Sequence, residues 1–118
     1  MSERRRAADL RGRRAEDEAA AWLETQGWKV LDRRRKTKAG EIDLICRKDR
    51  LVAFVEVKWR GRAGELDFAI DEYRLRRVAA AVETVAHEYA ADGEDIRVDV
   101  ILLAPGTAPR HIENAWMP

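Results

Sequence analysis

Three carboxylates and a lysine fall on two neighbouring segments whose residues alternate as in β-strands. Glu41 and Asp43 share one face of the first segment, and Glu56 and Lys58 share one face of the second, because successive side chains of a strand point to opposite faces. Paired carboxylates bind a hard divalent cation through oxygen. A nearby ammonium orients the attacking water or offsets phosphate charge. These residue types therefore predict metal-assisted hydrolysis of a phosphate ester.

The register between the two segments decides how close the carboxylates come. If a turn over 47–50 joins the segments, Asp43 faces Phe54 and Glu56 lies on the diagonal, about 7–8 Å away between backbones. A register shifted by two residues places Asp43 directly opposite Glu56. The alternative interpretation is a cross-strand salt-bridge set of Asp43, Glu56 and Lys58 on a solvated face. The position of Glu56 and Lys58 at the end of an apolar segment favours a functional site instead.

A further carboxylate, Glu16, interrupts the apolar stripe of a predicted N-terminal helix. Small and apolar residues surround it at helical spacing, namely Gly12, Ala15, Ala19, Trp22 and Leu23. Burial of an ionised glutamate is costly unless another group pairs with it. The helix pattern alone favours a position of Glu16 at the edge of the stripe, capped by an arginine.

The elements that position these residues follow from periodicity and turn residues. The sequence predicts helices over 7–26 and 67–91, strands over 28–31, 40–46, 51–58, 96–103 and 111–116, and a basic loop over 32–39. Residues 1–6 are expected to form a flexible basic arm. This order predicts an α/β fold in which helices flank a mixed central sheet, with 1–118 as a single domain.

The composition excludes several classes of protein. The chain has 118 residues, of which 38% are charged. Its longest apolar runs hold five residues, whereas a membrane-spanning helix needs roughly 20. The arginine-rich N-terminus lacks the apolar stretch of a secretory signal. The single cysteine, Cys46, rules out an internal disulfide and a cysteine-based zinc site, and we expect it to pack as a small core residue. We therefore expect a soluble, cytoplasmic protein without membrane contact.

The charge is distributed unevenly along the chain. Residues 1–62 contain 18 Lys and Arg against 11 Asp and Glu, whereas residues 63–118 contain 5 against 11. A basic half next to an acidic half is typical of proteins that bind a polyanion on one face. Nucleic-acid binding needs such local positive charge and does not need a high overall charge.

Two motifs carry a resemblance to a known family. The string GEIDLI over Gly40–Ile45, followed by FVEVK over Phe54–Lys58, resembles the D-x(n)-E-x-K signature of PD-(D/E)XK nucleases. More closely, the chain is similar to the bacterial YraN family, whose fold is similar to archaeal Holliday-junction resolvases. The spacing of Gly12, Glu16 and Ala19 and the string RVDV at 97–100 extend the match over nearly the whole chain.

The resemblance implies a restriction-endonuclease-like core and assigns roles to the acidic residues. Asp43 and Glu56 resemble the metal ligands, aided by the Val57 carbonyl, and Lys58 resembles the catalytic lysine. Glu16 resembles the helix-borne acid, which would give it a metal ion or Lys58 as a partner. Mg²⁺ or Mn²⁺ is the implied cofactor. The chain departs from the family pattern at Arg74, Leu75 and Val98, where Lys, Gln and Phe are usual; arginine can also bind phosphate.

The resemblance thus implies a metal-dependent endonuclease that acts on duplex or branched DNA, such as a Holliday junction. A two-fold homodimer would suit a four-way junction. The expected nucleic-acid contacts are Arg13, Arg14, Arg34, Arg35, Lys36, Lys38, Arg60 and Arg74. The alternative is a nucleic-acid-binding module that keeps the nuclease fold and does not cut.

Overall fold

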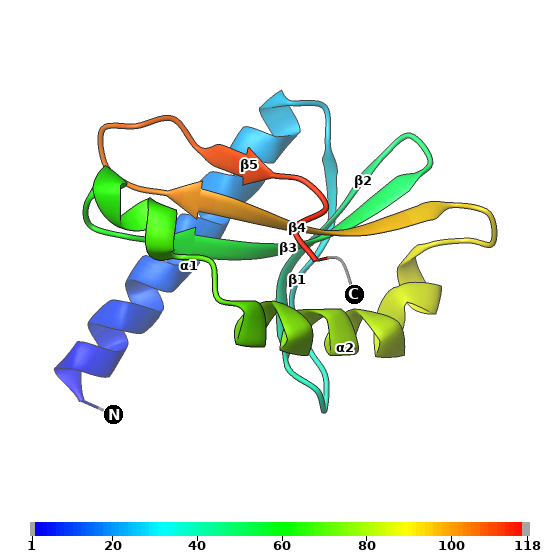
Figure 1. Cartoon of the computed structure of the whole chain (residues 1–118), viewed down its shortest axis with the longest axis horizontal. Coiled ribbons are helices and arrows are strands. Elements are labelled where there is room, and N and C mark those ends of the chain that lie inside the picture. The colour runs from blue at the N-terminus through cyan, green and yellow to red at the C-terminus, as the bar shows by residue number, and fades with distance from the viewer. Residues whose placement is uncertain (1, 117–118) are drawn as a thin grey trace.

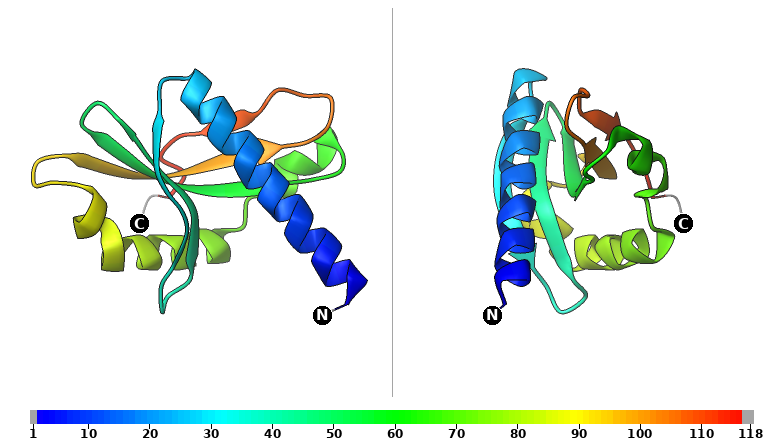
Figure 2. Two further views of the ribbon diagram at one scale, coloured as in Figure 1. Left: turned by 180° about the vertical axis from the view of Figure 1, so that it is seen from behind. Right: turned by 90° about the vertical axis from the view of Figure 1, so that its left-hand side faces the viewer.

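The computed structural model describes residues 2–116, in which a five-stranded sheet carries one long helix on each face (Figure 2). The elements are α1 (Glu3–Thr25), β1 (Lys29–Lys36), β2 (Glu41–Lys48), β3 (Leu51–Trp59), the 3₁₀ helix η1 (Ala63–Phe68), α2 (Glu72–Tyr89), β4 (Asp95–Leu103) and β5 (Arg110–Ile112). The predicted order of helices and strands is confirmed. The fold is α/β and is consistent with a restriction-endonuclease-like core.

The sheet is mixed, as predicted, and its strands follow one another in chain order, β1-β2-β3-β4-β5. Strands β3 and β4 are parallel, and the other neighbouring pairs are antiparallel. A parallel pair needs a long crossover connection. The segment containing η1 and α2 supplies it and lays α2 along one face of the sheet (Figure 1).

The side chains of β3 point alternately into two separate hydrophobic cores, one on each face of the sheet. Ala53 and Val55 pack with Ala19 and Leu23 under α1. Val52 and Phe54 pack on the opposite face, against the apolar stripe of α2, which consists of Leu75, Val78, Ala81, Val82 and Val85. Because of this alternation, Glu56 belongs to the α2 side of the sheet.

Strands β2 and β3 pair in the register that is shifted by two residues, the one expected to place Asp43 opposite Glu56. Lys48 pairs with Leu51, and the ladder runs to Leu44 opposite Val55. The turn therefore needs only two residues, of which Asp49 has the left-handed φ of 54° that such tight turns require. Continued by one residue, this register brings Asp43 opposite Glu56.

Strand β2 separates from β3 at Asp43. The last ladder pair is Leu44 with Val55, and beyond it the side chain of Asp43 accepts a hydrogen bond from the Val57 N–H at 2.8 Å. Ile42 packs in the core on the α2 side, whereas Leu44 packs under α1. The expected common face of Ile42, Leu44 and Cys46 is therefore wrong for Ile42, because the strand twists away once it leaves its partner. Cys46 is a buried core residue, as expected.

The predicted basic loop over 32–39 is wrong over most of its length. Strand β1 continues to Lys36, with Arg33 opposite Leu44 and Lys36 opposite Glu41. A β-bulge between Val30 and Asp32 shifts the register. An edge strand tolerates such a charged run because one side of it faces solvent.

The helix limits also differ from those expected. Helix α1 already begins at Glu3, because Ser2 accepts a hydrogen bond from the Arg5 N–H and caps it, so the expected arm is helical from that residue. The single helix expected over 67–91 is divided: η1 ends at Phe68, and Asp71 caps a separate α2. No helix within residues 2–116 combines the length and apolar character needed to cross a membrane.

Candidate active site

Three carboxylates from two elements meet where β2 leaves β3. Glu16 comes from α1, and Glu41 and Asp43 come from β2. One oxygen of each lies within 4.8 Å of the other two. The helix places Glu16 here because Ala15 and Ala19 bury their side of α1 against the sheet. The structure therefore brings Glu16 and Asp43 together, as the resemblance implied.

The surroundings of Asp43 disfavour the ionised form of its carboxyl group. Its burial, followed by repulsion from Glu56 and Glu16, raises the pKa of the carboxyl to about 7, although the hydrogen bond from Val57 and the charge of Arg74 act in the opposite direction. An ordinary aspartate is fully ionised at this pH. A cation near Asp43 would favour its ionised form.

Glu16 lies at the edge of its helix stripe and pairs with an arginine, as the helix pattern alone favoured. Arg34 Nε donates to Glu16 Oε1 at 2.6 Å. Burial nevertheless raises the pKa of Glu16, and Glu41 and Asp17 add to the effect. Glu16 therefore pairs with Arg34 and also lies close to Asp43.

Glu56 is the most deeply buried carboxylate at this end of the sheet, with an exposed fraction of 2%. Its Oε1 accepts a hydrogen bond from Arg74 Nε at 3.0 Å and lies 3.4 Å from Lys58 Nζ. Its Oε2 is buried and has no hydrogen-bond partner among residues 2–116. Buried polar atoms are nearly always paired, so this oxygen marks a position where the protein lacks a positive or hydrogen-donating group.

The donor set fits a hard divalent cation. Mg²⁺ and Mn²⁺ prefer carboxylate and water oxygens, and the buried carboxylates of Asp43 and Glu56 lie on strands that separate at this point. Val57 contributes its N–H to Asp43; the predicted role of its carbonyl stays a prediction.

A cleft of about 560 Å³ opens over Glu16, Glu41 and Asp43, and Glu56 does not line it. Its walls come from the N-terminal half of α1, the β1–β2 hairpin and the start of α2. Basic side chains line the cleft together with the acidic residues, namely Arg13, Arg34, Lys36 and Arg74. The cleft thus combines possible metal ligands with cations that suit phosphate.

The other predicted nucleic-acid contacts lie elsewhere or are engaged. Arg35 makes two hydrogen bonds to Glu88 of α2, each 3.0 Å long. Arg60 donates to the Trp59 carbonyl at 2.8 Å. Arg14 and Lys38 are exposed.

Sequence reasoning placed Glu41 on the face of Asp43 but did not single it out as a ligand. The signal was the G-E-I-D string itself, in which two acids two residues apart share a strand face. Its proximity to Glu16 depends on the angle at which α1 crosses the sheet, and no sequence pattern encodes that angle.

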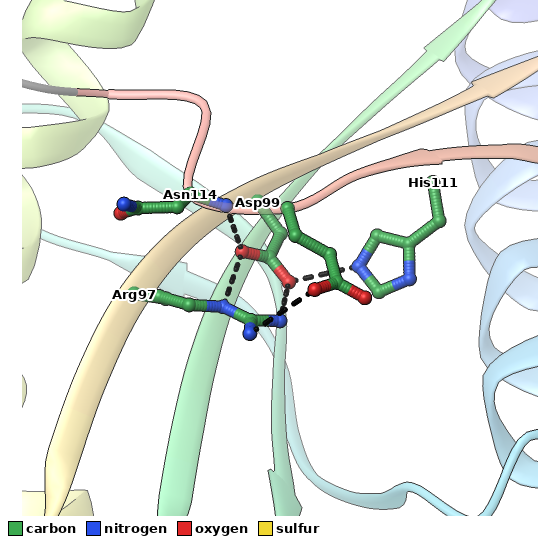
Figure 3. Close-up of polar contacts among 5 residues, drawn as sticks. Arg97, Asp99, His111 and Asn114 are labelled. Carbon is green, nitrogen blue, oxygen red and sulfur yellow. Dashed lines mark hydrogen bonds and ion pairs between the residues drawn. The ribbon is translucent and has the colours of Figure 1, made fainter.

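A second polar cluster lies on the α1 side of the sheet and was also missed (Figure 3). Asp99 of β4 is completely buried and accepts hydrogen bonds from Arg97, from the Asn114 N–H and, at 2.8 Å, from His111. The His111 ring meets Trp22 edge-on at 5.9 Å. His111 thus combines aromatic packing with a hydrogen bond. The available signal was a lone acid inside the apolar run 98–104.

Comparison with known proteins identifies the family. The model of the uncharacterised protein family UPF0102 matches residues 15–103. A UPF0102 protein of Erythrobacter litoralis is 62% identical over 115 residues, covering 98% of this chain and 99% of the relative. UPF0102 proteins of Sphingopyxis alaskensis (55% identical, covering 97% of this chain and 98% of the relative) and Rhizorhabdus wittichii (51%, covering 96% of each) are also similar. UPF0102 is the YraN family indicated by the GEIDLI and FVEVK strings. The chain therefore belongs to the uncharacterised protein family UPF0102.

Proposed function

We propose that this protein is a divalent-metal-dependent nuclease that hydrolyses phosphodiester bonds of DNA. The observation that carries the proposal is the buried, incompletely paired carboxylate of Glu56, which is close enough to Asp43 to repel its charge, while Asp43 itself lines a cleft that also carries cationic side chains. A protein that used these acids only for stability would be expected to pair both oxygens of a buried carboxylate.

Asp43 and Glu56 would hold Mg²⁺ or Mn²⁺, with Glu16 and Glu41 as nearby ligands directly or through water. When bound, such an ion supplies positive charge at the phosphate and makes a water molecule more acidic. The ionised form of Asp43 is the form that binds a cation.

Lys58 is the candidate for orienting the attacking water. Its ammonium is held 3.4 Å from Glu56 and is largely buried, with 18% of the side chain exposed, so it has little freedom to move. In the hydrolysis the water oxygen forms a bond to phosphorus, and the bond from phosphorus to one sugar oxygen breaks. The water gives up a proton, and the departing sugar oxygen takes one up.

The basic side chains of the cleft support a nucleic acid as the substrate. Arg13, Lys36 and Arg74 lie around the carboxylates at the cleft walls, where they can contact successive phosphates of a backbone. The arginine-rich start of α1 is exposed and extends beyond the sheet in Figure 2. Branched DNA, cut by a two-fold dimer, is the finer proposal, and comparison of four-way-junction with duplex cleavage tests its DNA substrate.

The direct test is cleavage of end-labelled duplex, single-stranded and four-way-junction DNA with Mg²⁺ or Mn²⁺. We expect the parent protein to cut only with metal. Asp43→Asn and Glu56→Gln should each reduce cleavage by more than about 100-fold, since even outer partners of metal ligands contribute about 10–100-fold. Glu88→Gln is the matched control, because this carboxylate pairs with Arg35 at the surface.

The alternative function gives a different pattern in the same assay. A non-catalytic binding module would bind these DNAs in a salt-sensitive manner, would cut none of them, and would bind equally well after Asp43→Asn. That result would contradict the nuclease proposal for these substrates.

A further inference from the structure

Two cationic side chains contact Glu56, but they differ in their freedom to move. Lys58 lies on the same strand and has 18% of its side chain exposed, whereas the Arg74 side chain is 53% exposed. Arg74 is the third residue of α2, and its Nε lies 3.0 Å from Glu56 Oε1. A half-exposed arginine on the first helical turn can change rotamer without disturbing the core.

Arg74 also borders the other carboxylates of the site. It lines the cleft over Glu41 and Asp43 and, beside it, a smaller hollow with Glu41 and Arg77. Attraction to Glu56 is the main reason why the pKa of Arg74 is raised, and Asp43 and Glu41 contribute as well. The Arg74 side chain borders both a small hollow that contains Glu56 and the cleft that contains Glu41 and Asp43, so it adjoins all the acids that a shared cation would contact.

Four carboxylates and three contacting cations leave the site with a formal excess of one negative charge when no ion is bound. The carboxylates are Glu16, Glu41, Asp43 and Glu56, and the cations that contact them are Arg34, Lys58 and Arg74. Addition of a divalent ion would leave an excess of positive charge around buried groups. The cation that is most exposed and most mobile is then the one expected to leave.

We propose that Arg74 is an internal counter-ion of Glu56 which a divalent metal ion displaces, so that Arg74 sets the metal affinity of the site and then binds phosphate. This inference rests on the proposed function. Without metal, the arginine keeps a buried glutamate paired. With metal, the freed guanidinium lies in the cleft, where its planar fork suits a phosphate group.

The test is calorimetric titration of Mn²⁺ into the protein without nucleic acid. Arg74→Gln should bind Mn²⁺ about tenfold more tightly than the parent, because the metal no longer competes with the guanidinium. Arg77→Gln is the matched control: it removes the same charge one turn further along α2, beside Glu41, and should change the affinity by less than about twofold if direct pairing matters more than general charge.

The same variants give a second readout with DNA. At saturating Mn²⁺, Arg74→Gln should cleave more slowly than the parent, whereas Arg77→Gln should not. Arg74→Gln binding Mn²⁺ no more tightly than the parent, or Arg77→Gln tightening it equally, would overturn the counter-ion role while leaving the nuclease proposal intact. Absence of Mn²⁺ binding in the parent and in both variants would overturn both.

Discussion

Two buried carboxylates on adjacent strands, Asp99 of β4 and Glu56 of β3, are paired very differently. Both oxygens of Asp99 accept hydrogen bonds, including two from the Arg97 guanidinium at 3.1 and 2.8 Å. Glu56 receives one hydrogen bond at Oε1 and none at Oε2 from residues 2–116. The protein thus pairs one buried acid completely and leaves the other incomplete.

The difference fits a structural role for Asp99 and the functional role proposed for Glu56. A buried charge stabilises a fold only when its hydrogen-bonding capacity is filled. Asp99 meets that condition and joins β4 to the segment around β5 (Figure 3). Glu56 does not meet it, and its incomplete pairing leaves an oxygen for a ligand.

The pKa values of Asp99 and Asp43 move in opposite directions for the same reason. Burial raises the pKa of Asp99, but the hydrogen bonds from His111, Arg97 and Asn114 outweigh it, so the pKa lies below the usual value. Burial and neighbouring carboxylates raise the pKa of Asp43 to about 7. Removal of charge should therefore have opposite effects at the two positions.

The largest expected effect on stability is at Asp99. Asp99→Asn leaves Arg97 and His111 without their charged acceptor in a buried setting, and we expect a loss on the order of 3 kcal/mol in the free energy of unfolding. Urea denaturation at pH 7 measures it. A loss below about 0.5 kcal/mol would show that the Asp99 cluster is not a structural centre.

A smaller effect of opposite sign is expected at Asp43. Its pKa is about 7 in the folded protein and about 3.9 in an unfolded chain. The folded state therefore holds a proton that the unfolded state has lost, and metal-free stability falls as pH rises from about 4 to about 7. Asp43→Asn removes this cost and should stabilise the metal-free protein by about 2 kcal/mol at pH 8.

The pH dependence distinguishes this effect from a general change in packing. Near pH 4 the parent carboxyl is protonated and neutral, so the stability difference between Asp43→Asn and the parent should disappear. Urea denaturation of both proteins from pH 4 to pH 8 measures the difference. A variant that is less stable than the parent at pH 8 would contradict the account of Asp43.

Much of the fold could be predicted from the sequence because apolar periodicity reports burial directly. The stripe of Leu75, Val78 and Val85 on α2 and the apolar run of β4 lie in the core. The limits of β1 could not be predicted in this way. The segment Arg33–Lys36 pairs with β2 as part of an edge strand. Its charged residues show no strand pattern in the sequence, because the strand is stabilised by pairing with residues that are distant in sequence.

The candidate site was predictable in its residue types and less so in its geometry. Alternation placed Asp43 and Glu56 on converging faces, but the length of the turn at Asp49 decided which register formed. The pairing of Arg74 with Glu56 joins α2 to β3 and depends on how that helix is seated on the sheet. Local sequence patterns carry no information about such contacts.

The most direct test of the central claim, that the cleft carboxylates bind a divalent ion, is calorimetric titration of Mn²⁺ at pH 6 and pH 8 into the parent and into Asp43→Asn. Because the pKa of Asp43 is about 7, the parent should bind about tenfold more tightly at pH 8 and release a proton at pH 6. The variant should bind much more weakly, without this pH dependence. Equal affinity of the two proteins, or no Mn²⁺ binding by the parent, would contradict the account.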